Sequence, residues 1–175
     1  VITNIKTPGV YVDEIPLFPP SVAQVATAIP AFIGYTQMAQ DTEGNTITQP
    51  VRIKSLLEFN TYFGGAYQPA SYTVKTDTAT LELVSAAADK RFHLYDCLRQ
   101  YYDNGGGDCY ILSVGRYTDS IGATAISGGI ESLRKYDEPT LIVFPDGVEL
   151  LDGSSDPDVS SLAGLHQQAL ALCAS

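Results

Sequence analysis

Short apolar runs alternate with segments of helical spacing along most of this chain, and no other feature limits the fold as strongly. Each run is brief and largely apolar, which is typical of a buried strand. The runs lie at residues 28–36, 109–114 and 141–146, with a shorter strand predicted at 51–53. Such alternation favours an α/β layered domain with a partly parallel, mixed sheet.

The segments between and after these runs have the spacing of helices. Ser55 and Glu58 form a capping box at the start of the first helix. Gly128 and Gly129 weaken the third helix, because glycine is a poor helix former. The last helical pattern reaches Ser175 without a stop signal, which predicts a truncated chain. The predicted helices cover residues 56–63, 93–103, 123–136 and 158–174.

Residues 1–27 differ from the rest and predict an extended N-terminal arm that carries one short strand. A Thr-Pro-Gly turn at residues 7–9 precedes the alternating residues 10–15, and Pro16, Pro19 and Pro20 then exclude a regular helix or a central strand. Such an arm cannot bury itself. It either packs back on its own domain, which is expected to span residues 28–175, or pairs with another chain.

Residues 66–91 are expected to form an insertion in that domain. They contain Thr-rich, β-prone stretches near residues 72–74 and 80–84. A hairpin or an irregular excursion fits this composition. The pattern does not decide between the two.

The composition excludes several classes of function. Ten Lys and Arg against twenty Asp and Glu give a formal charge of -10, which repels phosphate backbones, so nucleic acid is not an expected partner. No apolar stretch is long enough to insert in a membrane. Cys97, Cys109 and Cys173 form no metal or disulfide pattern, and we expect buried reduced thiols, which suits folding in a cytoplasm.

The sequence predicts no catalytic, cofactor-binding or metal-binding residues. The glycines at 105–107 follow a helix and precede a strand, which is the wrong end of a helix for phosphate. His93 and His166 lie on predicted helices, without the nucleophile elbow of a hydrolase. Asp146, at the end of a predicted strand, is the position where an α/β enzyme often carries a carboxylate. The acidic loop 152–158 lacks the ligand spacing of a calcium site, and we expect a solvated loop that caps the next helix through Ser154, Ser155 and Asp158.

Five segments resemble, in order, those of contractile tail sheath proteins from phages and phage-tail-like injection particles. The first, TPGVYVDE at residues 7–14, resembles the family's TPGVYxxE signature. The others are AFIGYT at 31–36, FNTYFGG at 59–65, the helix, glycine turn and Cys-Tyr strand of 98–115, and EPTLIVFPD at 138–146. The chain departs from the family in the insertion at 66–91 and in the absence of the C-terminal half.

This resemblance implies a structural subunit and not an enzyme. Sheath subunits stack as hexameric rings around an inner tube and contract to drive it through a target envelope. Their partners are further copies, the tube, the baseplate and terminator proteins. They assemble in the cytoplasm of the producing cell as part of a virion or phage-tail-like particle. Terminal arms exchange strands between neighbours in the family, so the expected inter-subunit strand comprises Val10, Tyr11, Val12, Asp13 and Glu14.

Two alternatives stay open at this stage. One is an enzyme or small-molecule-binding domain, because the α/β scaffold supports many activities. The other is a baseplate or terminator subunit of the same machine. A ligand pocket with converging polar groups would favour the first, and closed rings in place of helical polymers would favour the second.

Overall fold

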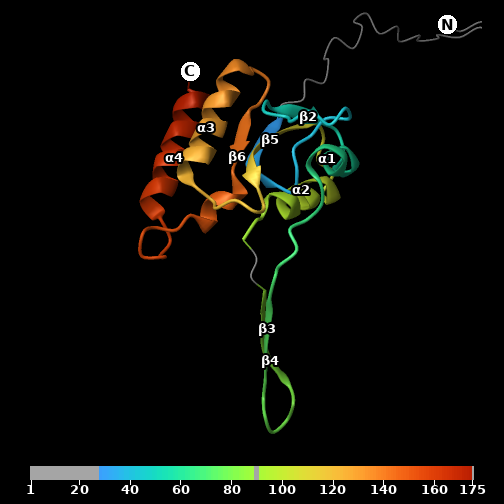
Figure 1. The fold of residues 1–175 in the computed structure, drawn as a ribbon. Helices are drawn as coiled ribbons and strands as arrows, with labels where there is room; N and C mark the ends of the chain where they lie inside the picture. Colours follow the sequence, from blue (N-terminus) through green and yellow to red (C-terminus); the bar gives the residue numbers. More distant parts are fainter. Residues whose placement is uncertain (1–27, 89–90, 175) are drawn as a thin grey trace, which may run out of the picture.

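A computed structural model describes residues 28–88 and 91–174 of the chain. The predicted arm, including the strand Val10 to Glu14, lies outside the described residues. The described residues form a layered α/β body and a hairpin that extends away from it (Figure 1). This architecture confirms the predicted α/β class.

The body is built on a mixed sheet of four strands in the order β2-β5-β1-β6. The central strand β1 pairs in parallel with β5 and with β6, whereas β2 pairs antiparallel with β5. The predicted partly parallel sheet is therefore confirmed. The strands are β1 (Pro30–Thr36), β2 (Val51–Ile53), β5 (Cys109–Arg116) and β6 (Leu141–Val143).

Helices cover both faces of this sheet (Figure 1). Side chains alternate along β1, so Ile33 packs in one core with α3 and α4 while Phe32 packs in the other with α1 and α2. The helices are α1 (Leu56–Phe63), α2 (Leu94–Asp103), α3 (Ala123–Ser132) and α4 (Val159–Cys173), with short 3-10 helices η1 (Leu133–Lys135) and η2 (Pro145–Glu149).

The start of α1 confirms the predicted cap. The hydroxyl of Ser55 accepts a hydrogen bond from the backbone N–H of Glu58 at 3.2 Å. The Glu58 carboxylate accepts in return from the N–H of Lys54 at 2.7 Å, one residue before the usual position of a capping box. Gly64 then ends the helix with a φ of 83°.

Helix α3 shows why a glycine occurs at position 129, whereas a Cβ atom at Gly128 would meet no other atom within 4 Å. A Cβ atom at Gly129 would lie 2.7 Å from side-chain atoms of Ile33 and of Val114, both on the sheet. The missing side chain lets the helix lie close against β1 and β5, which compensates for the poor helix propensity of glycine. The α-helix ends at Ser132 and continues as η1, so the prediction that it reaches residue 136 was too long.

Strand β6 corrects the prediction of a buried strand at residues 141–146. Only Leu141–Val143 is extended, and Pro145 begins η2. Among the described strands β6 lies at the sheet edge, and 51% of Leu141 is exposed. An apolar run of this length does not distinguish an edge strand from a central one.

The segment predicted as a hairpin or an irregular excursion contains a two-stranded hairpin. Its strands β3 (Tyr72–Thr76) and β4 (Leu83–Ala88) pair antiparallel, and they form a separate sheet from that of the body. An aromatic cluster stands near the base of the hairpin: the ring of Tyr67 lies 5.0 Å from that of Phe92 and 5.4 Å from that of Tyr117.

The three cysteines do not share one environment. Cys109 is buried in the sheet, and burial raises the pKa of its thiol to about 11. Cys97 is half-buried and Cys173 is exposed, so the expectation of three buried thiols was wrong for Cys173. Among the described helices, none is both long and apolar enough to pass through a bilayer.

Candidate functional site

Asp146 occupies the position where an α/β enzyme often carries a carboxylate, beyond the end of β6. Its side chain is fully buried. One carboxylate oxygen, Oδ2, accepts the backbone N–H of Tyr35 at 2.7 Å. The other, Oδ1, accepts the N–H groups of His93 at 2.6 Å and of Leu94 at 3.1 Å. All three partners are backbone groups of the protein itself.

This arrangement makes Asp146 a structural connection. The carboxylate binds the first N–H groups of α2, where a helix favours negative charge, and joins them to the end of β1. Gly34 allows the approach, because a Cβ atom there would lie 2.6 Å from Oδ2. Burial raises the pKa of the Asp146 carboxyl, and the three N–H donors oppose that shift. A carboxylate enclosed in this way is not presented to a substrate.

The two histidines are also engaged in the fold. His93 Nε2 lies 2.8 Å from a carboxylate oxygen of Glu149, and the two residues join α2 to η2. The ring of His166 packs on Phe144, with 4.9 Å between centroids. These contacts attach both imidazole rings to neighbouring elements of the fold.

The glycine turn after α2 uses its N–H groups internally. Gly105 and Gly106 donate to the carbonyls of Tyr102 and Tyr101 at 3.0 and 2.9 Å. Gly107 donates to the hydroxyl of Tyr101 at 3.1 Å. A phosphate loop needs such donors free to meet the anion, so this turn is a helix stop, as the sequence predicted.

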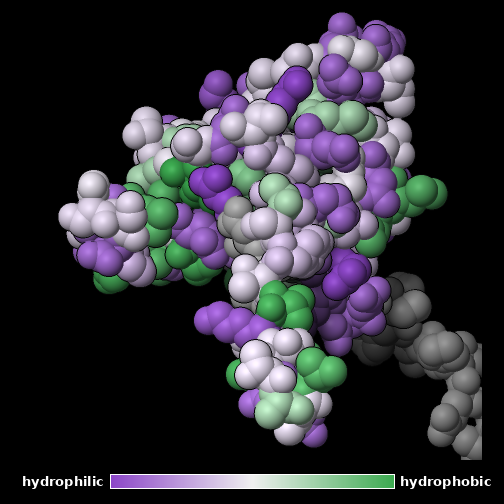
Figure 2. Space-filling view, turned by 60° about the horizontal axis from the view of Figure 1, so that its bottom comes forward, coloured by the Kyte–Doolittle hydropathy of each residue, from purple (hydrophilic) through white to green (hydrophobic). Residues whose placement is uncertain are grey.

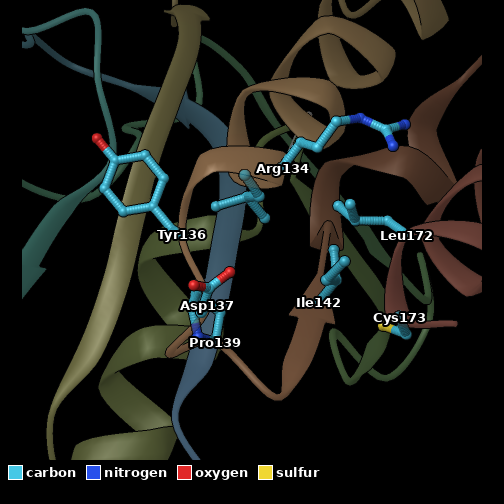
Figure 3. A pocket seen from close by; sticks show the side chains of 8 residues that line it. Arg134, Tyr136, Asp137, Pro139, Ile142, Leu172 and Cys173 are labelled. Carbon is cyan, nitrogen blue, oxygen red and sulfur yellow. The ribbon is translucent and has the colours of Figure 1, made fainter. Parts of the chain in front are cut away.

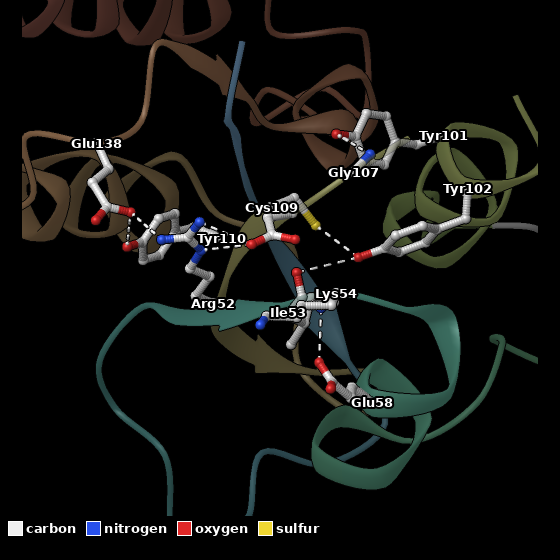
Figure 4. Close-up of polar contacts among 11 residues, drawn as sticks. Arg52, Ile53, Lys54, Glu58, Tyr101, Tyr102, Gly107, Cys109, Tyr110 and Glu138 are labelled. Carbon is white, nitrogen blue, oxygen red and sulfur yellow. Dashed lines mark hydrogen bonds and ion pairs between the residues drawn. The ribbon is translucent and has the colours of Figure 1, made fainter. Parts of the chain in front are cut away.

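Asp108, the residue after this turn, binds Arg52 in a polar cluster at the border of β2 and β5. Figure 4 shows Arg52, Tyr110 and Glu138 of this cluster. Arg52 on β2 reaches Asp108 at 2.8 Å and Glu138 at 2.7 Å. Tyr110 donates its hydroxyl to the same Glu138 oxygen at 2.8 Å. The cluster connects β2, β5 and the loop before β6. Because Arg52 and Glu138 are exposed, the expected contribution to stability is small.

A hollow of about 220 Å³ lies between β6 and the end of α4 (Figure 3). Ile142, Leu172 and Pro139 give it apolar walls. The guanidinium of Arg134 at its border is bound to Glu131 at 2.6 and 3.1 Å. Arg134, Tyr136 and Asp137 also line the hollow, which is smaller than a typical ligand pocket.

The acidic loop before α4 is organised by its own backbone. The Asp152 carboxylate accepts N–H groups of Ser154 and Asp156 at 2.7 and 3.0 Å. Asp158 caps α4 by accepting the N–H of Ser161 at 2.9 Å, as the sequence predicted. Among residues 28–88 and 91–174, no cluster of His, Cys, Asp or Glu has the arrangement of a metal site.

Tyr72 and Val74 on the hairpin form a surface that the sequence analysis did not assign. Both are more than half exposed although both are large and apolar. The period-two pattern of residues 72–76 is the signal that was present in the sequence. Exposed apolar side chains gathered on one element mark an interaction surface more often than a catalytic one.

The fold resembles chains of one contractile injection machine. A chain from the cryo-EM structure of the anti-feeding prophage (AFP) baseplate in the contracted state matches with a TM-score of 0.51 and 25% identity, over 98% of this chain and 38% of that chain. A chain from the AFP helical sheath in the contracted state matches with a TM-score of 0.47 and 22% identity, over 95% and 36%.

No protein-family model and no curated protein matches the sequence. The chain spans 38% of the length of the AFP baseplate-structure chain that it resembles. That likeness is to a structural protein of a phage-tail-like machine, in agreement with a non-enzymatic role.

Proposed function

We propose that this chain is the N-terminal part of a contractile sheath subunit, which polymerises around an inner tube and contracts to drive that tube through a target envelope. The observation that carries the proposal is the likeness to a chain of the AFP baseplate structure over 98% of this chain. The titratable groups described above are engaged in holding the fold, which also favours a structural role.

The four segments that resemble sheath proteins and lie within the described residues gather around the central strand. Residues 31–36 belong to β1, and residues 98–115 include the end of α2 and most of β5, which pairs with β1. Residues 138–146 include β6, the other neighbour of β1. Residues 59–65 end α1 on one face. The resemblance is therefore concentrated in the part of the body that fixes its fold.

The arm supplies the link between subunits in this proposal. A short strand, Val10 to Glu14, on proline-stiffened linkers is suited to pair with an open sheet edge of another chain. The described body has such edges at β2 and β6. Backbone hydrogen bonds would keep neighbours joined while the bodies rotate. Each subunit needs to release only a few kcal/mol for a large array to do substantial work.

A baseplate subunit is the second candidate, because the match with the higher TM-score comes from a baseplate structure. The two roles differ in how copies assemble. A sheath subunit forms long helical polymers, whereas a baseplate subunit forms a closed assembly of limited size.

The decisive experiment is negative-stain electron microscopy of the complete protein, with and without residues 1–20 and with Val12→Pro. We expect hollow striated cylinders from the wild type and none from the two altered proteins, because proline removes one hydrogen bond of the exchanged strand. Val12→Thr is the matched control, since it keeps the backbone N–H and a β-branched side chain.

Three outcomes would contradict parts of this proposal. Normal cylinders from Val12→Pro would show that the arm strand is not needed. Closed rings without cylinders from the wild type would favour the baseplate role. Dispersed small particles from the wild type, at concentrations where sheaths polymerise, would contradict the proposed assembly function.

A further inference from the structure

The β3–β4 hairpin extends from the body into solvent (Figure 1). Every residue from Ala70 to Ala86 is exposed. The exposed side chains include large apolar ones, with 66% of Tyr72 and 61% of Val74 accessible. A two-stranded hairpin without a covering layer is only marginally stable in water. This element is therefore expected to gain stability from a surface that covers it.

The two faces of the hairpin differ in polarity. Residues that are paired across the strands share a face, and these pairs are Val74 with Ala86 and Thr76 with Leu83. Tyr72 lies two residues before Val74, so its side chain is on the same face as Val74. A register shift beside Thr76 brings Leu83 to this side. We call Tyr72, Val74, Leu83 and Ala86 the apolar face of the hairpin; Thr76, the partner of Leu83, lies on the same face, and the opposite face carries Thr73, Lys75 and Ser85. Hydrophobic residues stand out on the hairpin in Figure 2.

The body has a hollow of matching character between the end of β6, η2 and α4. Its volume is about 290 Å³. Val148, which is 63% exposed, is part of its lining, and the packed rings of Phe144 and His166 contribute to its wall. No Lys, Arg, Asp or Glu is among the described residues that line it. We call this site, lined chiefly by Val143, Phe144, Pro145, Val148, Leu162 and His166, the apolar hollow.

Charge indicates which partner fits these two surfaces. The whole chain carries a formal charge of -10, so two copies repel each other over most of their surfaces. The hairpin from residue 70 to 86 carries Lys75 against Asp77 and Glu82, and the apolar hollow carries none of the four charged residue types. A basic partner would bind the acidic parts of the chain and not these two nearly neutral surfaces. A second copy meets the least repulsion where both contacting surfaces are nearly neutral.

We propose that the apolar face of the hairpin on one copy packs into the apolar hollow of a second copy. The two surfaces are different parts of one chain, so the contact is head-to-tail and each copy both gives and receives a hairpin. Such contacts close into a ring or continue as a helical polymer. This inference rests on the proposed function and names a second link between subunits besides the arm.

The contact is small, and this determines how it is measured. A hairpin of about six residues per strand is roughly 20 Å long and covers less surface than a standard protein interface. A single pair of copies therefore associates weakly, whereas many such contacts add up along an assembly.

The test is sedimentation velocity of the 175-residue chain over a rising concentration series. The wild type is expected to show a sedimentation coefficient that increases with concentration. Val74→Asp and Val148→Asp place a charge in the contact and should weaken association by about tenfold or more. Thr73→Asp is the matched control, because it adds the same charge to the opposite face of the same strand. Circular dichroism verifies that each variant is folded.

Mixing the two defective variants tests the head-to-tail geometry. Val148→Asp has an intact hairpin and Val74→Asp an intact hollow, so an equimolar mixture should form dimers but no longer species. A wild type that stays monomeric, or equal weakening by Thr73→Asp and Val74→Asp, would overturn the proposal. Loss of association in Val74→Asp but not in Val148→Asp would overturn the assignment of the hollow.

Electron microscopy of the complete protein separates this inference from the proposed function. Cylinders formed equally well by wild type and Val74→Asp would overturn the hairpin contact and leave the sheath proposal intact. Absence of cylinders from the wild type would overturn the sheath proposal, while the sedimentation series still decides whether the hairpin contact exists.

Discussion

Asp146 holds together three segments that are far apart in the sequence. Its two oxygens bind N–H groups at the end of β1 and at the start of α2, 52 to 111 residues away. A sequence pattern places an aspartate after a strand but cannot identify such distant partners. The sequence predicted Asp146 at the end of a strand, whereas it lies in η2 after β6, and no local pattern indicates that backbone donors occupy both of its oxygens.

Replacing Asp146 with Asn tests this role. The amide NH₂ group would face at least one of the backbone donors that the carboxylate now accepts. We expect the free energy of unfolding to fall by about 1–3 kcal/mol, since a buried donor is left without an acceptor. Urea unfolding measures the change, with Asp137→Asn, at an exposed position, as the control. Equal unfolding midpoints for the two variants would contradict the structural role of Asp146.

At the scale of single elements, features set by neighbouring residues could be predicted from the sequence, whereas features set by packing between elements could not. The caps at Ser55 and Asp158 were predicted because a capping side chain and its helix are neighbours in sequence. The edge position of β6 and the role of Gly129 depend on which elements lie beside them. A local pattern contains neither fact. The sequence therefore predicted a buried strand where β6 lies at the edge, and a weakened helix where Gly129 allows close packing.

The cap of α4 makes a pH-dependent contribution to stability. Hydrogen bonds from Ser161 hold the pKa of Asp158 below its ordinary value of 3.8, so the folded state favours the charged carboxylate. This contribution is present above 3.8 and is lost as the pH falls through the lower pKa of the folded state. Asp158→Asn keeps a capping oxygen that does not titrate.

We therefore expect the stability of the wild type relative to Asp158→Asn to decrease on acidification. Thermal unfolding of both proteins, from neutral pH to below 3.8, measures the difference. The comparison between variants removes the titration of the other carboxylates, which both proteins share. A constant difference across this range would contradict a charged cap in the folded state.

At the scale of the whole molecule, the described residues form a body with two cores, and residues 70 to 86 of the hairpin contribute to neither. No residue from Ala70 to Ala86 belongs to the buried set, whereas Tyr67 packs on Phe92 near the base of the hairpin. The α/β class and the order of most elements could be predicted from the sequence because each element has its own periodicity. The direction in which the hairpin extends could not.

Removing the hairpin should leave the body intact. When residues 71–86, which are all exposed, are replaced by a short glycine and serine link, we expect little change in the melting temperature, because none of these side chains belongs to the core. Tyr67→Ala, which removes a ring from the aromatic cluster, should lower the melting temperature more. Differential scanning calorimetry compares the two. A large decrease for the hairpin deletion alone would mean that the hairpin packs on its own body.

The close approach at Gly129 has a mechanical consequence. At Gly129 the backbone of α3 lies directly on Ile33 and Val114, so no side chain of the helix separates it from the sheet at this point. Tightly packed interiors of this kind deform little and pass strain from one side to the other. A force applied to one edge of the body is therefore carried across it with little loss, and any change of shape in a chain of such bodies is concentrated in the joints between them.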